Sequence, residues 1–461
     1  MLIPSRALFA VAVAVSGGLL LMPGIAGLEP LQARTAAVVV LAIGFWSTAV
    51  VPAFLGSLVF LFAAMVLAVA PASVVFSGFH SGAIWLVFGG LVLGLSVQRV
   101  GLDVRLVRNL LQHLPRGYLA LIYGIFAVGL ALAFVIPSAS GRVAILVPIV
   151  LALAGRLGFD EGSRGRSGLV LAATMGTTVP SFSVLPANVP NMGLYGAAES
   201  IYGIHLTYGE YFGLNFPALG VGALVVYPLL ISLLFRDTPR PPGASEATLA
   251  WSRAEQRLLV ILLVALALWV TDTLHGVSPA WVALGAALLC VAPRIGLLPP
   301  AAVTRDIDYA PVLFLAGIIG LGAIATHNGL GTLIADRLLG VTGLALGSDA
   351  ANFATITGIG VVVGIVTTLP AQPSIMAPLA QGMADASGWS LIGVLMAPVA
   401  TWSIFPFPYQ APPLVIAIAL ANLRILEVFR LLAAFFVFGV LVMLPLHFLW
   451  GRWLGYFTAV G

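Results

Sequence analysis

The stretch from Ala131 to Ala154 constrains this chain most, because it is apolar at both ends and polar in the middle. Its centre is Pro137-Ser138-Ala139-Ser140-Gly141-Arg142. An arginine at the centre of a membrane-length apolar run costs at least about 2.5–3.5 kcal/mol unless the protein compensates it. Proline removes a backbone donor and glycine relaxes the backbone, so a helix is predicted to break here. Broken backbone at membrane depth survives only inside protein or beside a water-filled cavity, which predicts a binding site.

The composition places the chain among polytopic membrane proteins. Of 461 residues, 61% are hydrophobic and 8% charged, and the mean hydropathy is +1.12, far outside the range of soluble proteins. Fifty-one glycines and 30 prolines fit a fold with interrupted helices. The net charge of +4 is explained by cytoplasmic arginines, so no nucleic-acid partner is expected. Cys290 is the only cysteine, which excludes an internal disulfide and a thiolate metal site.

Thirteen apolar stretches predict about 11 transmembrane helices and two re-entrant hairpins. They are 7–27, 35–51, 52–70, 82–113, 120–155, 167–196, 213–235, 255–274, 279–292, 310–338, 350–386, 389–420 and 425–449. The stretches 120–155 and 350–386 each contain a Pro/Ser/Thr break near the centre. Each half is then too short to cross comfortably, so we expect both stretches to return to the side they entered.

The placement of the arginines agrees with two hairpins. With the N-terminus inside, most arginines fall on the cytoplasmic side, as the positive-inside rule requires: Arg6, Arg105, Arg108, Arg116, Arg156, Arg164, Arg166, Arg236, Arg240, Arg253, Arg257, Arg294, Arg305, Arg424 and Arg430. Only Arg34, Arg337 and Arg452 fall outside. If 120–155 crossed once, the arginine clusters on its two flanks would lie on opposite sides. The same topology places the C-terminus outside the cell.

The chain divides into two similar halves. A polar, proline-rich linker (241–254) separates repeat 1 (35–240, after an N-terminal helix in 1–34) from repeat 2 (255–461). The pair Gly101-Leu102 corresponds to Gly329-Leu330, an offset of 228 residues (329 − 101), and Pro148 corresponds to Pro378. One hairpin opens from the cytoplasm and the other from outside, so the repeats are inverted. Inverted repeats with discontinuous helices near the midplane are typical of secondary transporters.

Several motifs are those of a known family. They include Phe45-Trp46-Ser47-Thr48-Ala49-Val50-Val51-Pro52, Trp269-Val270-Thr271-Asp272 and Asp306-Ile307-Asp308-Tyr309. Pro/Asn-rich loops follow both hairpins, at 185–191 and 405–413. In these residues the chain resembles the divalent anion:sodium symporter (DASS) family of the ion transporter superfamily. The resemblance implies a homodimer in the bacterial inner membrane that moves small anions by an elevator motion, with unwound helices at 167–196 and 389–420.

The resemblance also locates the hairpin tips. Members of the family carry a Ser-Asn-Thr motif ten residues before a proline, which here corresponds to Ser138-Ala139-Ser140 and Thr368-Leu369-Pro370. In sodium-coupled members the asparagine of each tip helps to build the sodium site. Ala139 and Leu369 supply no side-chain oxygen, so proton coupling or anion exchange becomes more plausible than sodium coupling. Backbone carbonyls freed by unwinding are the alternative ligands for sodium.

The candidate substrate ligands lie at the two tips: Ser138, Ser140, Arg142, Thr367, Thr368, Gln372 and Ser374. Arg142 suits carboxylate or sulfate oxygens, although it can also cap hairpin carbonyls. The serines can donate to an anion or bond to their own backbone. Ala139 lies beside a candidate cation site. The loop residues Asn188, Asn191, Tyr409 and Gln410 are candidates for contact with substrate or cation, or for satisfying broken backbone.

The predicted function is secondary transport of a dicarboxylate, citrate or sulfate, with sodium ions or protons as the possible coupling ions. No cofactor, enzymatic site or metal-ligand cluster is evident in the sequence. The alternatives are a cation/proton antiporter, an arsenite-type permease and a membrane-embedded protein that does not transport. A cation antiporter would require a midplane carboxylate, and neither tip carries one.

Overall fold

The computed structural model describes residues 5–22, 24, 27–48, 50–106, 117–239 and 250–460. These residues form helices and connecting loops, with one isolated β-bridge between Trp389 and Ala459 and no strand. Among them, seven helices are long and apolar enough to cross a membrane by length and composition. The prediction of an all-helical polytopic membrane protein is confirmed.

Two series of helices follow the same order along the chain. The first comprises α2 (Pro30–Thr48), α3 (Ala53–Val66), α6 (Gly82–Val100), α8 (Tyr118–Ala133), α9 (Ala139–Arg156), α10 (Arg164–Thr178), η2 (Pro180–Ser183), η3 (Leu185–Ala187), α11 (Val189–Tyr202), α12 (Tyr208–Asn215), η4 (Phe216–Val221) and α13 (Gly222–Leu234). The second comprises α14 (Arg253–Val270), α16 (Pro279–Val291), α18 (Ala310–His327), α20 (Asp349–Val366), α21 (Gln372–Ser387), α22 (Leu391–Met396), η6 (Ala397–Ser403), η7 (Pro408–Gln410), α23 (Pro412–Ala421), α24 (Ile425–Phe438), η8 (Gly439–Met443) and α25 (Leu444–Trp453).

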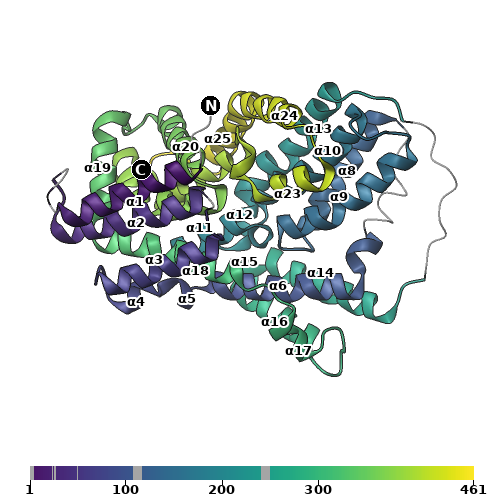
Figure 1. Ribbon diagram of the computed structural model, residues 1–461, viewed down its shortest axis with the longest axis horizontal. Helices are drawn as coiled ribbons and strands as arrows, with labels where there is room; N and C mark the ends of the chain where they lie inside the picture. The colour runs from purple at the N-terminus through teal and green to yellow at the C-terminus, as the bar shows by residue number, and fades with distance from the viewer. Residues whose placement is uncertain are drawn as a thin grey trace.

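The other elements of the described residues are α1 (Ser5–Leu21), α4 (Ala72–Val75), α5 (Ser77–His80), α15 (Asp272–His275), α17 (Pro300–Arg305), α19 (Leu330–Thr342) and η5 (Leu369–Ala371). The correspondence between the two series extends to irregular backbone. Each series ends in a long helix interrupted by a π-helical turn, η4 in the first and η8 in the second. Figure 1 shows hairpin α8–α9 beside α10 and α23 at the right of the view, with α1, α2, α3 and α18 at the left.

Both broken stretches form hairpins, as predicted. The Tyr118 ring, at the start of α8, packs edge-on against Phe159 just after α9, with 6.0 Å between ring centroids. In the second hairpin, Trp389, just after α21, donates from Nε1 to Asp349 at the start of α20 over 3.1 Å. The outer ends of each hairpin therefore lie together, and each hairpin returns to the side it entered.

Two predicted spans were too long. The helices end at Val100 and His327, short of the predicted limits 113 and 338, because Gly101 (φ 77°) and Gly329 (φ 69°) adopt the left-handed conformation that terminates a helix. The residues 107–116, which include two of the arginines assigned to the cytoplasm, lie outside the described residues.

The predicted domain boundaries do not coincide with helix ends. The boundary at 34/35 falls inside α2, and α14 begins at Arg253, within the predicted linker. Residues 240–249, which make up most of that linker, lie outside the described residues.

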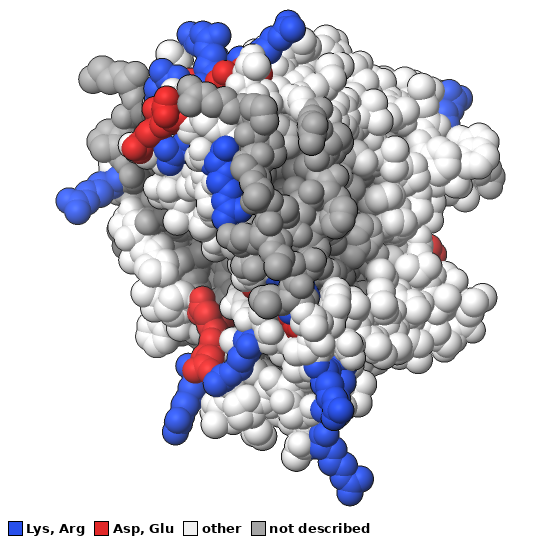
Figure 2. Space-filling model, turned by 90° about the vertical axis from the view of Figure 1, so that its right-hand side faces the viewer, with Lys and Arg blue, Asp and Glu red and all other residues white. Residues whose placement is uncertain are grey.

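Residues assigned to the same side of the membrane contact one another. Arg424, assigned to the cytoplasmic side, donates over 3.1 Å to the carbonyl of Gly162, which lies between the cytoplasmic Arg156 and Arg164. Arg99, which the sequence leaves at or near membrane depth, pairs with Asp306 at 2.9 Å. Figure 2, which looks onto the right-hand end of Figure 1, shows arginine side chains near both the upper and the lower edge of this face, with acidic side chains beside them in each place. Charged side chains at helix ends are the pattern that a membrane–water boundary produces.

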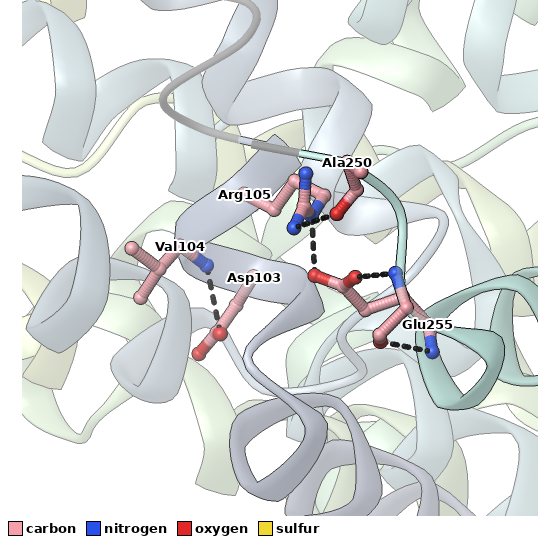
Figure 3. A network of polar contacts seen from close by, with 6 residues as sticks. Asp103, Val104, Arg105, Ala250 and Glu255 are labelled. Carbon is pink, nitrogen blue, oxygen red and sulfur yellow. Dashed lines mark hydrogen bonds and ion pairs between the residues drawn. The ribbon is translucent and has the colours of Figure 1, made fainter. Parts of the chain in front are cut away.

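An ion pair fixes the start of repeat 2 to repeat 1. Arg105 donates to the Glu255 carboxylate and, over 3.0 Å, to the Ala250 carbonyl (Figure 3). Its guanidinium also lies 5.3 Å from the centroid of the Trp251 ring. The second oxygen of Glu255 accepts from the Ser252 N–H over 2.7 Å and so caps α14. The chain that re-enters after the linker is thereby held beside the end of α6.

Small residues allow the first hairpin to pack closely on α10. A Cβ atom at Gly176 would lie 2.4 Å from the Phe126 carbonyl oxygen, and one at Gly129 would lie 2.6 Å from the Thr177 nitrogen. Contacts this short leave no room for a methyl group, so α8 and α10 meet backbone to backbone, as small residues allow in membranes.

Gly176→Ala is expected to lower the thermal unfolding temperature of the purified protein, because overpacking against backbone costs about 1–3 kcal/mol. Gly285→Ala is the matched control. Gly285 also lies inside a helix, α16, but nothing lies within 4 Å of its Cβ position, so this variant should be neutral or slightly stabilised. Equal unfolding temperatures for the two variants would show that α8 and α10 are not in backbone contact.

Candidate functional site

Arg142 is fully buried and bonded to the backbone freed by the helix breaks. Its Nη1 donates to the carbonyls of Ile136, at the end of the first hairpin arm, and Ala187, at 3.1 Å. Its Nη2 donates to the Thr177 carbonyl at 2.8 Å and the Ser181 hydroxyl at 2.9 Å. The guanidinium therefore joins the first hairpin tip to the broken helix formed by α10, η2, η3 and α11.

No Asp or Glu among the described residues forms an ion pair with Arg142. Its positive charge is compensated only by carbonyl and hydroxyl dipoles. A buried cation held by dipoles alone is costly, and a bound anion nearby would offset that cost.

Ser181 completes this arrangement, although no motif in the sequence points to it. The Ser181 hydroxyl accepts from Arg142 and, over 2.7 Å, from Asn188 Nδ2. It donates to the Thr177 carbonyl over 2.8 Å. Asn191, also fully buried, donates to the carbonyls of Ser181 and Val184 at 3.0 and 2.7 Å. Asn191 thus satisfies carbonyls of the broken helix, whereas Asn188 bonds the Ser181 side chain; their contact with a substrate or a cation stays a prediction.

At the second tip, neutral side chains bond the carbonyls at the end of α20. Gln372 donates to the Gly360 carbonyl at 2.8 Å and to the Thr401 hydroxyl at 2.9 Å. Gln410 donates to the Gly364 carbonyl at 2.6 Å, and the Tyr409 hydroxyl donates to the Ile365 carbonyl. Gln372 therefore occupies the same place in repeat 2 as Arg142 in repeat 1, since both join a hairpin arm to a broken helix.

The two broken helices meet each other. Phe182 in η2 packs edge-on against Trp402 in η6, with 6.0 Å between ring centroids. Each hairpin tip is bonded to the broken helix of its own repeat, so this aromatic contact links the two tips through the centre of the protein.

Buried polar atoms that lack a partner gather in the same region. Nine buried side-chain atoms have no hydrogen-bond partner among the described residues, and six of them belong to Arg142 or the broken helices. Arg166 Nε lies at the outer end of α10, and the other five are Arg142 Nε, Thr177 Oγ1, Asn191 Oδ1, Trp402 Nε1 and Ser403 Oγ. An unpaired buried polar group costs about 1–3 kcal/mol. Their concentration here marks a site that a polar ligand would complete.

The predicted substrate ligands separate into two groups. Ser138, Ser140 and Thr368 are half-buried, and the hydroxyls of Ser140 and Thr368 bond no described residue. Ser138 Oγ accepts from the Gly141 N–H over 3.2 Å and retains its own proton to donate.

The second group is buried and bonded to protein oxygens: Arg142, Thr367, Gln372 and Ser374. In this structure these four stabilise backbone, and their contact with an anion stays a prediction. Ala139, predicted beside a cation site, is buried at the start of α9. Among the described residues, no group of three or more His, Cys, Asp or Glu side chains could hold a metal ion.

Residues 5–457 match the family model described as the sodium:sulfate symporter transmembrane region. The chain belongs to this family. It is 28% identical over 207 residues to the L-tartrate/succinate antiporter of Escherichia coli K12, covering 42% of each chain. It is 24% identical over 321 residues to a membrane protein of Cupriavidus necator, and this match covers 64% of this chain and 63% of that protein. The matches thus span less than two thirds of either relative.

Solved transporters share the fold. The YdaH transporter of Alcanivorax borkumensis is 16% identical, with a TM-score of 0.54 over 87% of this chain and 89% of the other. MtrF of Neisseria gonorrhoeae, whose structure illuminates a class of antimetabolite efflux pumps, is 14% identical, with a TM-score of 0.51 over 81% of both chains. At these identities the likeness concerns the fold alone.

Ser181→Ala is expected to lower the thermal unfolding temperature in the absence of any anion. The change removes the acceptor shared by Arg142 and Asn188, and unpaired buried donors cost about 1–3 kcal/mol each. Ser183→Ala is the matched control. Ser183 is equally buried in the same turn, but its hydroxyl donates only to the Pro180 carbonyl. If Ser183→Ala were as destabilising as Ser181→Ala, Ser181 would have no special role.

Proposed function

We propose that this chain is a secondary active transporter of a small di- or trivalent anion, of the dicarboxylate, citrate or sulfate class. One observation carries the proposal: Arg142 is buried at a hairpin tip with half-buried hydroxyls, and no described Asp or Glu pairs with it. The family and the antiporter relative support the same function.

The anion would meet hydroxyls and backbone first. Ser138, Ser140 and Thr368 supply donors at the two tips, and the N-termini of α9 and α21 offer N–H groups with the positive ends of their dipoles. Both Nη atoms of Arg142 already bond protein oxygens. Only its unpaired Nε–H remains to donate to the anion, so Arg142 would act mainly through its charge. Its field is strong because little water screens a buried charge.

The same geometry favours anion exchange or proton coupling over sodium coupling. Ala139 and Leu369 are both buried and supply no side-chain oxygen. Freed carbonyls were the alternative ligands for sodium, and near the first tip those of Ile136, Ala187 and Thr177 already bond Arg142. These three carbonyls already face a fixed positive charge, which disfavours a sodium ion beside them.

An elevator motion would carry the site across the membrane. Both hairpins and the helices at 167–235 and 389–449 would move against the remaining helices, in a homodimer of the inner membrane with a cytoplasmic N-terminus and an external C-terminus. In this conformation, Glu199 of α11 accepts from the Ser81 hydroxyl at 2.6 Å and the Gly82 N–H at 2.7 Å. These bonds join the proposed moving and fixed parts, so they would break during transport.

Counterflow in proteoliposomes tests the function. Vesicles loaded with unlabelled succinate, L-tartrate, citrate or sulfate are expected to accumulate the labelled form of the preferred anion. Replacing sodium with choline should leave the rate largely intact, because the tips lack the sodium-ligating asparagines. Failure of the whole anion panel, with sodium and protons both varied, would overturn the proposal, and a steep sodium dependence would overturn the coupling.

Thr368→Val is expected to raise the KM for that anion about tenfold or more, since it removes a donor to a charged ligand. Ser374→Ala is the comparison and should leave the KM unchanged. The Ser374 hydroxyl is buried and donates to the Ala371 carbonyl. An unchanged KM in Thr368→Val would remove this hydroxyl from the site.

A further inference from the structure

A narrow cavity lies between the second hairpin and the second broken helix. Gln372, Met376 and Met383 line it from α21, Leu194 from α11, and Pro398 and Trp402 from η6. It has room for about one water molecule. Most of its wall is apolar, so any polar group that lines it is exceptional.

Two polar residues line the cavity. The Gln372 amide donates to protein oxygens, so the unpaired one is Trp402. Its side chain is 1% exposed, and its indole Nε1 has no acceptor among the described residues. A buried indole N–H normally finds a partner. Leaving it unpaired costs about 1–3 kcal/mol.

The other tryptophans show that this fold otherwise pairs its shielded indoles. Those that are shielded donate to a carbonyl or carboxylate: Trp46 to Ala53, Trp269 to Pro279, Trp389 to Asp349 and Trp450 to Gly213. The remaining four are more than a third exposed: Trp85, Trp251, Trp281 and Trp453. All nine tryptophans of the chain lie among the described residues, and Trp402 alone is buried without an acceptor.

Its position places this donor at the centre of the transport machinery. Trp402 contacts Phe182 of the first broken helix, and its neighbour Thr401 bonds Gln372 at the second hairpin tip. The adjacent Ser403 hydroxyl is also buried and unpaired. Two neighbouring donors in η6, Trp402 Nε1 and Ser403 Oγ, therefore lack acceptors among the described residues, in the turn that bonds the second hairpin through Thr401.

We propose that Trp402 Nε1–H donates a hydrogen bond to an oxygen of the transported anion and thereby contributes to substrate specificity. This inference rests on the proposed function. Because the cavity is too narrow for a dicarboxylate, α21 must move away from η6 before the anion can reach Trp402. The flexible side chains of Met376 and Met383 suit a wall that re-packs. An anion with oxygens at both ends, such as a dicarboxylate, could contact the tip hydroxyls and Trp402 together.

Trp402→Phe tests the proposal with the anion identified by counterflow. It keeps an aromatic ring and removes the N–H, so KM should rise about tenfold or more while kcat changes little. Without anion, its unfolding temperature should equal or exceed that of the wild type, since an unpaired buried donor has gone. Stabilisation by added anion should shrink in parallel.

Trp269→Phe is the matched control. Trp269 is also buried, but its N–H is paired with the Pro279 carbonyl at 3.0 Å. This variant should lose stability and keep its KM, the reverse of the Trp402 result. If Trp402→Phe fails to fold, benzothienylalanine incorporated at position 402 keeps the bicyclic shape and removes only the N–H.

The outcomes are distinct. A wild type that neither transports nor is stabilised by succinate, L-tartrate, citrate or sulfate would overturn the proposed function itself. A wild type that transports, with an unchanged KM at Trp402→Phe or the benzothienyl variant, would overturn this inference alone. In that case the Trp402 indole N–H would donate to a buried water instead of the anion.

Discussion

The fold depends on one constraint: every carbonyl freed by a broken helix at membrane depth needs a donor from the protein. At the first tip Arg142 donates four hydrogen bonds, three of them to backbone carbonyls freed by the breaks. Unpaired backbone in hydrocarbon costs several kcal/mol for each group, so the break and its partners must be present together. The polar interruption in an apolar stretch is stable because these bonds surround it.

The two repeats meet this constraint with different chemistry. Gln372 joins hairpin to broken helix in repeat 2, as Arg142 does in repeat 1, but only Arg142 brings a charge. The centre of the protein therefore holds a fixed positive charge on one side and neutral amides on the other. A fixed charge cannot dissociate as a coupling ion does, which suits a carrier that exchanges one anion for another.

The sequence was sufficient to predict the hairpins, because proline and glycine among small polar residues interrupt an apolar run in a way that an unbroken membrane helix seldom tolerates. The left-handed glycines at 101 and 329 were visible as repeated Gly-Leu pairs, yet their role as helix ends became clear only from the backbone. Roles of individual side chains were harder to predict. Arg142 was given two roles, and the structure shows it capping carbonyls. Ser181, Thr401 and Trp402 carried no signal, because a lone hydroxyl or indole gains significance only from the atoms that surround it in three dimensions.

The most direct test asks whether the two hairpins enter from opposite faces. Single cysteines at the exposed positions Leu119 and Glu161, which flank the first hairpin, and Ser348 and Asp385, which flank the second, can be introduced after the native Cys290 is replaced by serine. An impermeant maleimide applied to right-side-out and inside-out vesicles should label the first pair only from the cytoplasmic side and the second pair only from outside. Labelling of Leu119 and Glu161 from different sides would mean that the first stretch crosses the membrane once, and would contradict the account.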